Sequence, residues 1–285
     1  MIELEADLAN LRSPVVLAAF EGWNDAGDAS TGAIDHLAQV FDATPIGAID
    51  PDDYYDFQVN RPTVSLVDGL TRHITWPTSH LSLCSPPDGD HDLVLLRGVE
   101  PNMRWRAFCG ELIGAFTELG VGTVVTLGAL LADAPHTRPV QVTGTAQDAA
   151  TAERLGLTRS RYEGPTGIVG VFHQACDQAG MTAASFWAAV PHYVAQPPCP
   201  KATIALLRRI EDLLDLAIPL GTLPEAARAW EERVDELARE DGDVMEYVRN
   251  LEARESAEDL PEASGDAIAR EFERYLRRRP TDTDD

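Results

Sequence analysis

Short, continuous apolar runs that alternate with helical repeats constrain the fold of this chain more than any other feature. Residues 15–20 form an apolar run too short for a free-standing helix, so the run predicts a buried strand. A polar, glycine-containing loop then leads to a helical repeat at 29–41. Residues 92–97 and 121–127 are further buried runs, and a helical repeat between Pro101 and Gly120 separates them. This β-α-β alternation predicts parallel strand pairing with helices on the faces of the sheet.

Other segments predict that the sheet is mixed. Residues 63–67, 73–76 and 81–84 alternate apolar and polar positions, which is typical of half-buried antiparallel strands. We also expect strands at 45–50 and 139–145 and helices at 146–155 and 168–179, whereas the apolar stretch 183–190 fits either type.

A proline-rich segment, 191–200, ends the α/β pattern. We therefore predict an α/β domain at 1–200, a helical C-terminal region at 201–279 and a disordered tail at 280–285. The helical region carries apolar stripes, and a lone amphipathic helix is marginal in water. The stripes must cover the α/β domain, pack on one another or contact another chain. They occur at Leu206, Ile210, Leu213 and Ala217; at Leu223, Ala227, Trp230, Val234 and Leu237; at Val244, Tyr247, Val248 and Leu251; and at Ile268, Phe272, Tyr275 and Leu276.

Composition excludes several classes of protein. The formal net charge of −24 repels phosphate backbones, so we expect no nucleic-acid partner. No window approaches the roughly 20 apolar residues of a membrane helix, and the N-terminus lacks a signal pattern, so we expect a cytoplasmic protein with no membrane partner. The four cysteines are widely spaced, which favours buried, reduced thiols.

The loop after the first strand is the best candidate site by position. Glu21, Asp25 and Asp28 could bind a divalent cation, and Trp23 and Asn24 lie between them. The alternative is that Asp25 or Asp28 caps the following helix and the glycines serve the turn. Capping alone explains an aspartate at a helix start, so we favour it.

Three further segments place polar residues after strands or in turns. Arg97, Glu100 and Arg104 could hold an anion at a helix start, although Glu100 pairing with either arginine is the simpler interpretation. Thr126 and His136 could form a nucleophile and base, but no recognised spacing supports them. His173 and Cys176 are interpreted as packing residues. The complete candidate cleft comprises Glu21, Trp23, Asn24, Asp25, Arg97, Glu100, Arg104, His136, Arg138, Glu163 and Thr166. Thr166 is also a potential helix cap.

Several of these segments resemble the actinobacterial branch of the proteasome assembly chaperone 2 family. They are FEGWNDAGD (20–28), GVEPNMRWR (98–106), TLGALLADAPHTRPVQVTG (126–144), YEGPTGIVG (162–170), WAAVPHYVAQPPCPK (187–201) and SGDAIAREFERYLRRR (264–279). The resemblance implies a three-layer α/β/α fold like that of purine nucleoside phosphorylases, with a largely parallel mixed sheet, a helical C-terminal region and self-association, a trimer being one option. Relatives that bind proteasomes often end in a hydrophobic-Tyr-X tail. This chain ends in Thr283-Asp284-Asp285 and departs from that pattern.

Two functions follow as hypotheses. The first is a non-enzymatic protein-binding module that acts on protein subunits, proteasome subunits among them, or as a homo-oligomeric scaffold. The second is an enzyme or small-ligand binder that uses the candidate cleft at the carboxyl ends of the strands. The chain lacks G-x-S-x-G, G-x-x-x-x-G-K-[ST] and H-E-x-x-H motifs, so we assign no catalytic residue, cofactor or metal.

Overall fold

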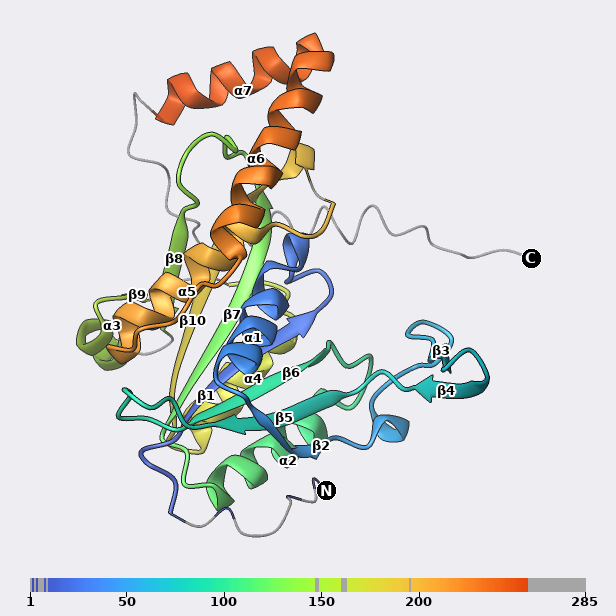
Figure 1. The fold of residues 1–285 in the computed structure, drawn as a ribbon. Helices are drawn as coiled ribbons and strands as arrows, with labels where there is room; N and C mark the ends of the chain where they lie inside the picture. Colours follow the sequence, from blue (N-terminus) through green and yellow to red (C-terminus); the bar gives the residue numbers. More distant parts are fainter. Residues whose placement is uncertain are drawn as a thin grey trace. The chain divides into compact units, whose positions relative to one another are not determined.

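The computed structural model of this chain describes residues 2, 4, 8, 10–146, 149–159, 163–194 and 196–255. Within these residues the strands form an eight-stranded mixed sheet, ordered β2-β5-β6-β1-β7-β10-β8-β9, and a separate two-stranded sheet of β3 and β4 (Figure 1). The strands are β1 (Val15–Glu21), β2 (Thr44–Ala48), β3 (Thr63–Val67), β4 (Thr71–Thr75), β5 (Ser79–Cys84), β6 (Leu93–Val99), β7 (Thr123–Ala132), β8 (Val142–Ala146), β9 (Thr158–Arg159) and β10 (Thr182–Pro191). The helices are α1 (Ala29–Val40), α2 (Trp105–Glu118), α3 (Ala149–Leu155), α4 (Ile168–Gln178), α5 (Pro200–Leu214), α6 (Leu223–Glu240) and α7 (Gly242–Glu255), with short 3-10 helices at η1 (Ala26–Asp28), η2 (Pro51–Asp53) and η3 (His192–Val194).

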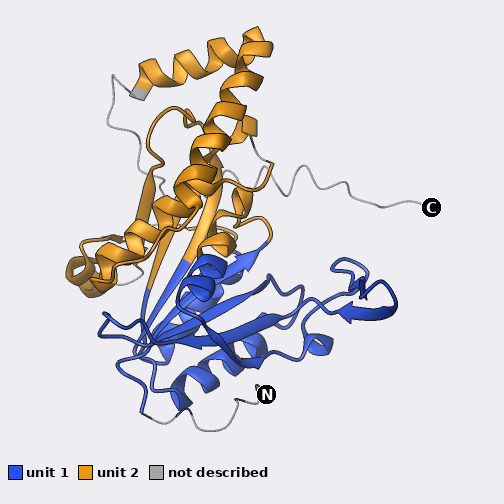
Figure 2. Ribbon diagram, in the orientation of Figure 1, with its two compact units in different colours: residues 1–21, 34–126, 167–183 blue, residues 22–33, 127–166, 184–285 orange. Residues whose placement is uncertain are grey.

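The chain divides into two compact units, and the boundaries between them fall within helix α1 and within strands β7 and β10 (Figure 2). Unit 1 contains residues 1–21, 34–126 and 167–183, and unit 2 contains residues 22–33, 127–166 and 184–285.

Unit 1 is built around the parallel pair β1 and β6. Their registers match Val15 with Leu93 through to Glu21 with Val99, and the apolar residues of both strands are almost entirely buried. Helices α2 and α4 pack against each other, and Phe116 and Phe172 meet edge to face with ring centroids 6.1 Å apart. Successive residues of a strand point to opposite faces of the sheet, so the burial of nearly all of them shows that both faces are covered here. A strand covered on both faces has a continuous apolar sequence.

Unit 2 holds the C-terminal helices. Helix α6 packs against both α5 and α7, and the buried residues of α6 are Ala227, Trp230, Val234 and Ala238. Leu237, which we expected in the stripe, is 57% exposed, and Ala238 takes its place one residue later. Mutual packing therefore accounts for the stripes of α6 and α7, whereas α5 packs both on α6 and on the α/β part of unit 2, where Thr203 donates to the Ala29 carbonyl oxygen and α5 contacts β8.

The antiparallel β3–β4 hairpin is more exposed than any other pair of strands in the described residues. Asp68, Gly69 and Leu70 form its turn, and Asp68 and Gly69 have the positive φ that favours a tight turn. Every residue of both strands is exposed, so the expectation that they are half-buried is wrong. The antiparallel pairing itself is confirmed, and so is that of β5 with β6.

The expected three-layer α/β/α class, with its mixed sheet and helical C-terminal region, is confirmed. The ambiguous stretch 183–190 is strand β10. The domain boundary at residue 200 stays a prediction. The stripe at 268–276, the tail at 280–285 and the chain end lie outside the described residues.

Candidate functional site

The carboxylate of Asp25 caps helix α1. Its Oδ1 accepts hydrogen bonds from the Ser30 backbone N–H at 2.7 Å, the Ser30 hydroxyl at 2.6 Å and the Thr31 backbone N–H at 3.3 Å. Its Oδ2 accepts a further hydrogen bond from the Thr31 hydroxyl. Asp25 is 6% exposed, so these donors replace the water that the carboxylate loses on burial. The capping interpretation is therefore confirmed for Asp25, and Asp28 lies in η1 just before the helix.

Trp23 and Asn24 pack into unit 2 beside the cap. The Trp23 ring stacks on the Trp187 ring with centroids 6.1 Å apart. Asn24 is fully buried, and its backbone carbonyl oxygen accepts a hydrogen bond from the Ala129 backbone N–H. The next turn is equally tight. A Cβ atom on Gly27 would lie 2.7 Å from Cys199 Cβ, and Gly27 already has a φ of 62°. The loop is thus held from both sides by close packing.

Glu21 and Arg97 belong to a polar cluster in unit 1. Arg97 Nη1 lies 2.6 Å from Glu21 Oε1, and Arg97 Nε lies 2.7 Å from Asp35 Oδ1. Burial alone would lower the pKa of Arg97, but the charges of Asp35 and Glu21 outweigh it and raise that pKa. Two carboxylates therefore share one guanidinium, and Asp35 is a partner that sequence reasoning missed.

Glu100 and Arg104 have partners other than those expected. We predicted that Glu100 pairs with Arg97 or Arg104. The structure places Glu100 Oε1 2.9 Å from the Ile168 backbone N–H, at the start of α4. Arg104 forms an exposed ion pair with Asp53, and its guanidinium lies over the Tyr54 ring, 5.7 Å from the centroid. Glu100 therefore acts on the first turn of α4, where the positive end of the helix favours a carboxylate.

His136 anchors the loop after β7 to the C-terminal helices of unit 2. Its ring, which is almost fully buried, pairs through Nδ1 with the Tyr193 hydroxyl at 2.8 Å and through Nε2 with Asp235 Oδ1 at 3.0 Å. Lys201 donates to the His136 carbonyl oxygen and forms an ion pair with Glu231. Burial raises the pKa of Tyr193 to about 12, so this phenol stays neutral. The only lysine of the sequence is thus a tether between α5, α6 and this loop.

The remaining candidates lie in different surroundings. Thr126 Oγ1 lies 2.7 Å from His173 Nε2, and both residues are buried in unit 1. Arg138, Glu163 and Thr166 are exposed. Gly167, not Thr166, is the N-cap residue of α4.

Thiol and metal chemistry gain no support within the described residues. Burial raises the pKa of Cys84, Cys109 and Cys176 to about 12 and that of Cys199 to about 11, so all four stay protonated. The described part of the chain has no group of three or more His, Cys, Asp or Glu residues arranged to hold a metal ion. Over the same residues, no helix is both long and apolar enough to cross a membrane.

The candidate residues therefore separate into small structural clusters. Glu21, Arg97, Glu100 and Arg104 belong to unit 1, and the other seven belong to unit 2. That all eleven line one cleft stays a prediction. Sequence reasoning missed Asp35, Asp53, Tyr193, Glu231 and Asp235, because their partners lie up to 99 positions away along the chain and no local pattern marks such pairs.

The fold and these clusters define an α/β protein with a helical C-terminal region, in which Asp25, Glu100 and His136 make contacts within the chain. Residues 19–238 match the PAC2 family, so the chain belongs to that family.

Two solved structures from actinobacteria are similar over most of their length. A PAC2 family protein from Streptomyces avermitilis is 58% identical, with a TM-score of 0.77 over 82% of this chain and 99% of its own. A proteasome-assembly chaperone homologue from Mycobacterium tuberculosis is 60% identical, with a TM-score of 0.75 over the same shares. An archaeal proteasome activator, PbaB from Pyrococcus furiosus, shares the fold at 16% identity, with a TM-score of 0.66 over 83% of this chain and 98% of its own. No curated protein gave a match.

Proposed function

We propose that this protein is a non-enzymatic protein-binding module of the assembly-chaperone kind, and that it binds unassembled proteasome subunits through the β3–β4 hairpin. The observation that carries the proposal is the exposed apolar surface of this hairpin. Of the nine large apolar side chains that are exposed in the described residues, seven lie between positions 59 and 76. They are Val59, Val64, Leu66, Val67, Leu70, Ile74 and Trp76, with exposures from 47% to 87%.

The register of the hairpin gathers several of these side chains on one face. Val64 lies opposite Ile74, and Leu66 lies two residues along the same strand, so all three point to the same side of the ribbon. A two-stranded hairpin is marginally stable in water, and a monomer rarely exposes more than several hundred Å2 of contiguous apolar surface. Both considerations favour a surface that a partner covers.

Charge indicates what kind of partner suits this surface. The whole chain carries a net charge of −24, yet residues 59–76 contain Arg61 and Arg72 and only one carboxylate, Asp68. An exposed apolar segment that carries two guanidinium groups suits a protein surface that is apolar and edged with carboxylates. The name of the Mycobacterium tuberculosis homologue supports a proteasome subunit as that partner.

The polar clusters support a non-enzymatic role. The Asp25 carboxylate accepts four hydrogen bonds within the protein, and Glu21 and Asp35 share Arg97. Groups held in this way are poorly placed to move protons to or from a substrate.

The test is binding of the purified full-length protein to purified, unassembled α and β subunits of the proteasome from the same cells, measured by biolayer interferometry. Leu66→Asp places a charge on the apolar face, whereas Ser65→Asp places the same charge one residue away on the opposite face of the ribbon. We expect Leu66→Asp to weaken binding by at least about tenfold and Ser65→Asp to change it by less than about twofold. Equal effects of the two substitutions, or no binding by the unmodified protein, would refute the proposal.

Self-association is measured in the same purified sample. We propose that the protein forms homo-oligomers, a property that its family resemblance implies, and sedimentation velocity measures their size directly. A single species with the mass of one chain, 31.0 kDa, at all concentrations would rule out homo-oligomers without affecting the subunit-binding proposal.

A further inference from the structure

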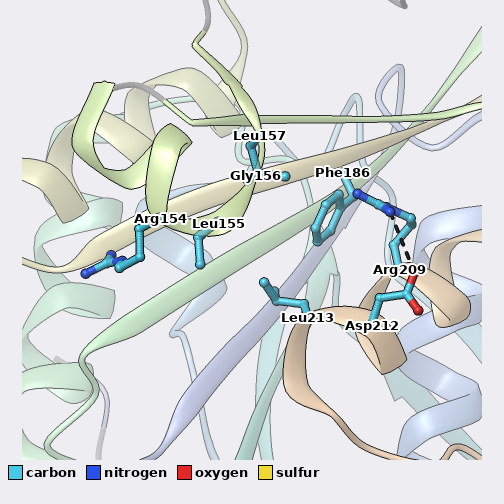
Figure 3. Close-up of a pocket in the computed structure, with 8 residues that line it drawn as sticks. All are labelled: Arg154, Leu155, Gly156, Leu157, Phe186, Arg209, Asp212 and Leu213. Atoms are coloured by element: carbon cyan, nitrogen blue, oxygen red, sulfur yellow. Dashed lines mark ion pairs between the residues drawn. The ribbon is translucent and has the colours of Figure 1, made fainter.

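Unit 2 contains a pocket that none of the candidate cleft residues lines. It has a volume of about 380 Å3 and lies between the end of α3, the strand β10 and the last turns of α5 (Figure 3). Pockets that bind small molecules typically start at about 300 Å3, so this one can hold a ligand of modest size.

The walls of the pocket combine apolar and charged side chains. Leu155 and Leu213 point toward its centre, and Phe186 closes it beside Leu157 (Figure 3). Gly144, in strand β8, lies against Leu157 and Phe186. A Cβ atom on Gly144 would lie 2.5 Å from Leu157 Cδ2 and 2.8 Å from Phe186 Cε1, so the absence of a side chain there lets both residues settle.

One guanidinium group supplies the main charge. Arg209 lies over the Phe186 ring, 5.3 Å from its centroid, and its Nη1 is 3.6 Å from Asp212 Oδ2, which is a loose contact with an exposed carboxylate. Among the described residues, the buried Nε of Arg209 has no hydrogen-bond partner. Arg154 also lines the pocket but extends away from the leucines (Figure 3). The pocket therefore sets the guanidinium group of Arg209 beside three leucines and Phe186, in a protein whose net charge is −24.

We propose that this pocket binds a carboxylate group attached to a short aliphatic body. The guanidinium of Arg209 holds the carboxylate in a bidentate pair, in which its two Nη groups each donate to one oxygen. The aliphatic body lies against Leu155, Leu157 and Leu213, where it removes apolar surface from water. Arg154, Arg209 and Asp212 together give the lining one net positive charge, which favours a carboxylate over a doubly charged phosphate.

Two sources present this chemistry: the C-terminal residue of a polypeptide and a free aliphatic acid. Isothermal titration calorimetry of the full-length protein distinguishes them with four probes. These are octanoate, N-acetyl-L-leucine, N-acetyl-L-leucinamide and a pentapeptide that ends in leucine with a free carboxylate. We expect N-acetyl-L-leucine to bind with a dissociation constant below about 10 mM and the amide, which lacks the charge, to bind at least about tenfold more weakly.

The order of affinities identifies the source. A pentapeptide that binds more tightly than octanoate supports a polypeptide C-terminus, and the reverse order supports a free acid. If the acid and its amide bind equally, or if no acid shows saturable binding up to about 10 mM, the proposal is wrong.

Neighbouring arginines on α5 provide a matched pair of variants. Arg209→Gln removes the guanidinium from the pocket, whereas Arg208→Gln removes the same charge from an exposed position one residue earlier. We expect Arg209→Gln to weaken binding of the acid by at least about tenfold and Arg208→Gln to change it by less than about twofold. Circular dichroism establishes that both variants are folded. Equal affinities of the two folded variants would overturn the assignment of Arg209.

Discussion

The loop of residues 21–28 and the β3–β4 hairpin each differ in the structure from what their sequences indicate, but in opposite ways. The loop concentrates carboxylates, an amide and an indole after a buried strand, which is the usual place for a ligand site in an α/β fold. The structure uses Asp25 as a helix cap and stacks Trp23 on Trp187. The hairpin resembles an ordinary pair of half-buried strands in sequence, but its apolar side chains are exposed. A cluster of polar residues can therefore stabilise the fold, while an apolar segment stays exposed and accessible to a partner.

This contrast depends on which backbone and side-chain partners are nearby. A carboxylate after a strand can face a ligand or the N–H groups of the following helix, and in this loop the helix supplies the donors. An apolar strand can face a core or another molecule, and no helix within the described residues covers the hairpin as α2 and α4 cover the β1–β6 pair. The predictions below test this contrast, starting from the largest expected effect.

Removal of the Asp25 carboxylate should destabilise the protein most. Asp25→Ala leaves two backbone N–H groups and two hydroxyls of the α1 start without their acceptor, and we expect a loss of about 3 kcal/mol in the free energy of unfolding. Urea denaturation monitored by circular dichroism measures it. Asp25→Asn keeps one acceptor oxygen and should cost about 1 kcal/mol. If Asp25→Ala unfolds at the same urea concentration as the unmodified protein, Asp25 is free for another role.

A side chain at Gly128 should disturb the packing that holds the loop. Its Cβ atom would lie 2.5 Å from the Trp187 ring, which in turn stacks on Trp23. We expect Gly128→Ala to cost about 2 kcal/mol, again by urea denaturation. Gly114→Ala is the control, because nothing lies within 4 Å of its added Cβ atom in α2, and it should stabilise the protein by up to about 1 kcal/mol. Equal effects would mean that the loop tolerates repacking.

Asp92, a buried carboxylate outside the loop, provides a pH-dependent comparison. Burial raises the pKa of Asp92, but hydrogen bonds from the Arg12 backbone N–H and guanidinium outweigh burial, and the pKa is lowered overall. The unfolded chain therefore takes up a proton at a higher pH than the native protein does. The stability is present above the unfolded value near pH 4 and is lost as pH falls through the lower native value.

Asp92→Asn should remove that acid-dependent loss. At pH 7 the variant should be about 1 to 2 kcal/mol less stable than the unmodified protein, and the gap should narrow below about pH 4. Urea denaturation at a series of pH values measures both. A gap that stays constant across the series would show that the charge of Asp92 contributes nothing.

Substitution on the hairpin should affect the stability of the isolated protein least. Leu66 is 60% exposed, so Leu66→Ser removes little buried apolar surface and should change the free energy of unfolding by less than about 0.5 kcal/mol. Urea denaturation at low protein concentration measures it. A loss above about 2 kcal/mol would show that Leu66 packs within its own chain and is not a free surface.

The sequence predicts the elements whose pattern is local and strong. The apolar run 15–20 requires burial wherever it lies, and it forms β1. Asp25 at a helix start predicts its own cap. The stretch 183–190 could not be assigned, since a short apolar run fits a buried strand or a buried helix, and its place between β7 and β8 in the sheet makes it a strand.

Contacts between distant residues could not be predicted. Nothing in the sequence links His136 to Asp235 or Arg97 to Asp35, because the fold alone brings their side chains together. The exposure of β3 and β4 was also hidden, since alternation specifies two faces of a strand but not what covers either face. The contact between Arg209 and Phe186 could not be predicted either, because no local pattern links residues that are distant in the sequence.

Binding of unassembled proteasome subunits by hairpin and loop variants, compared side by side, tests the central claim most directly. We predict that Leu66→Asp loses at least about tenfold in affinity and that Asp25→Asn, if folded, binds like the unmodified protein. The account would be contradicted if Asp25→Asn lost binding while Leu66→Asp kept it, because the loop and not the hairpin would then be the functional surface.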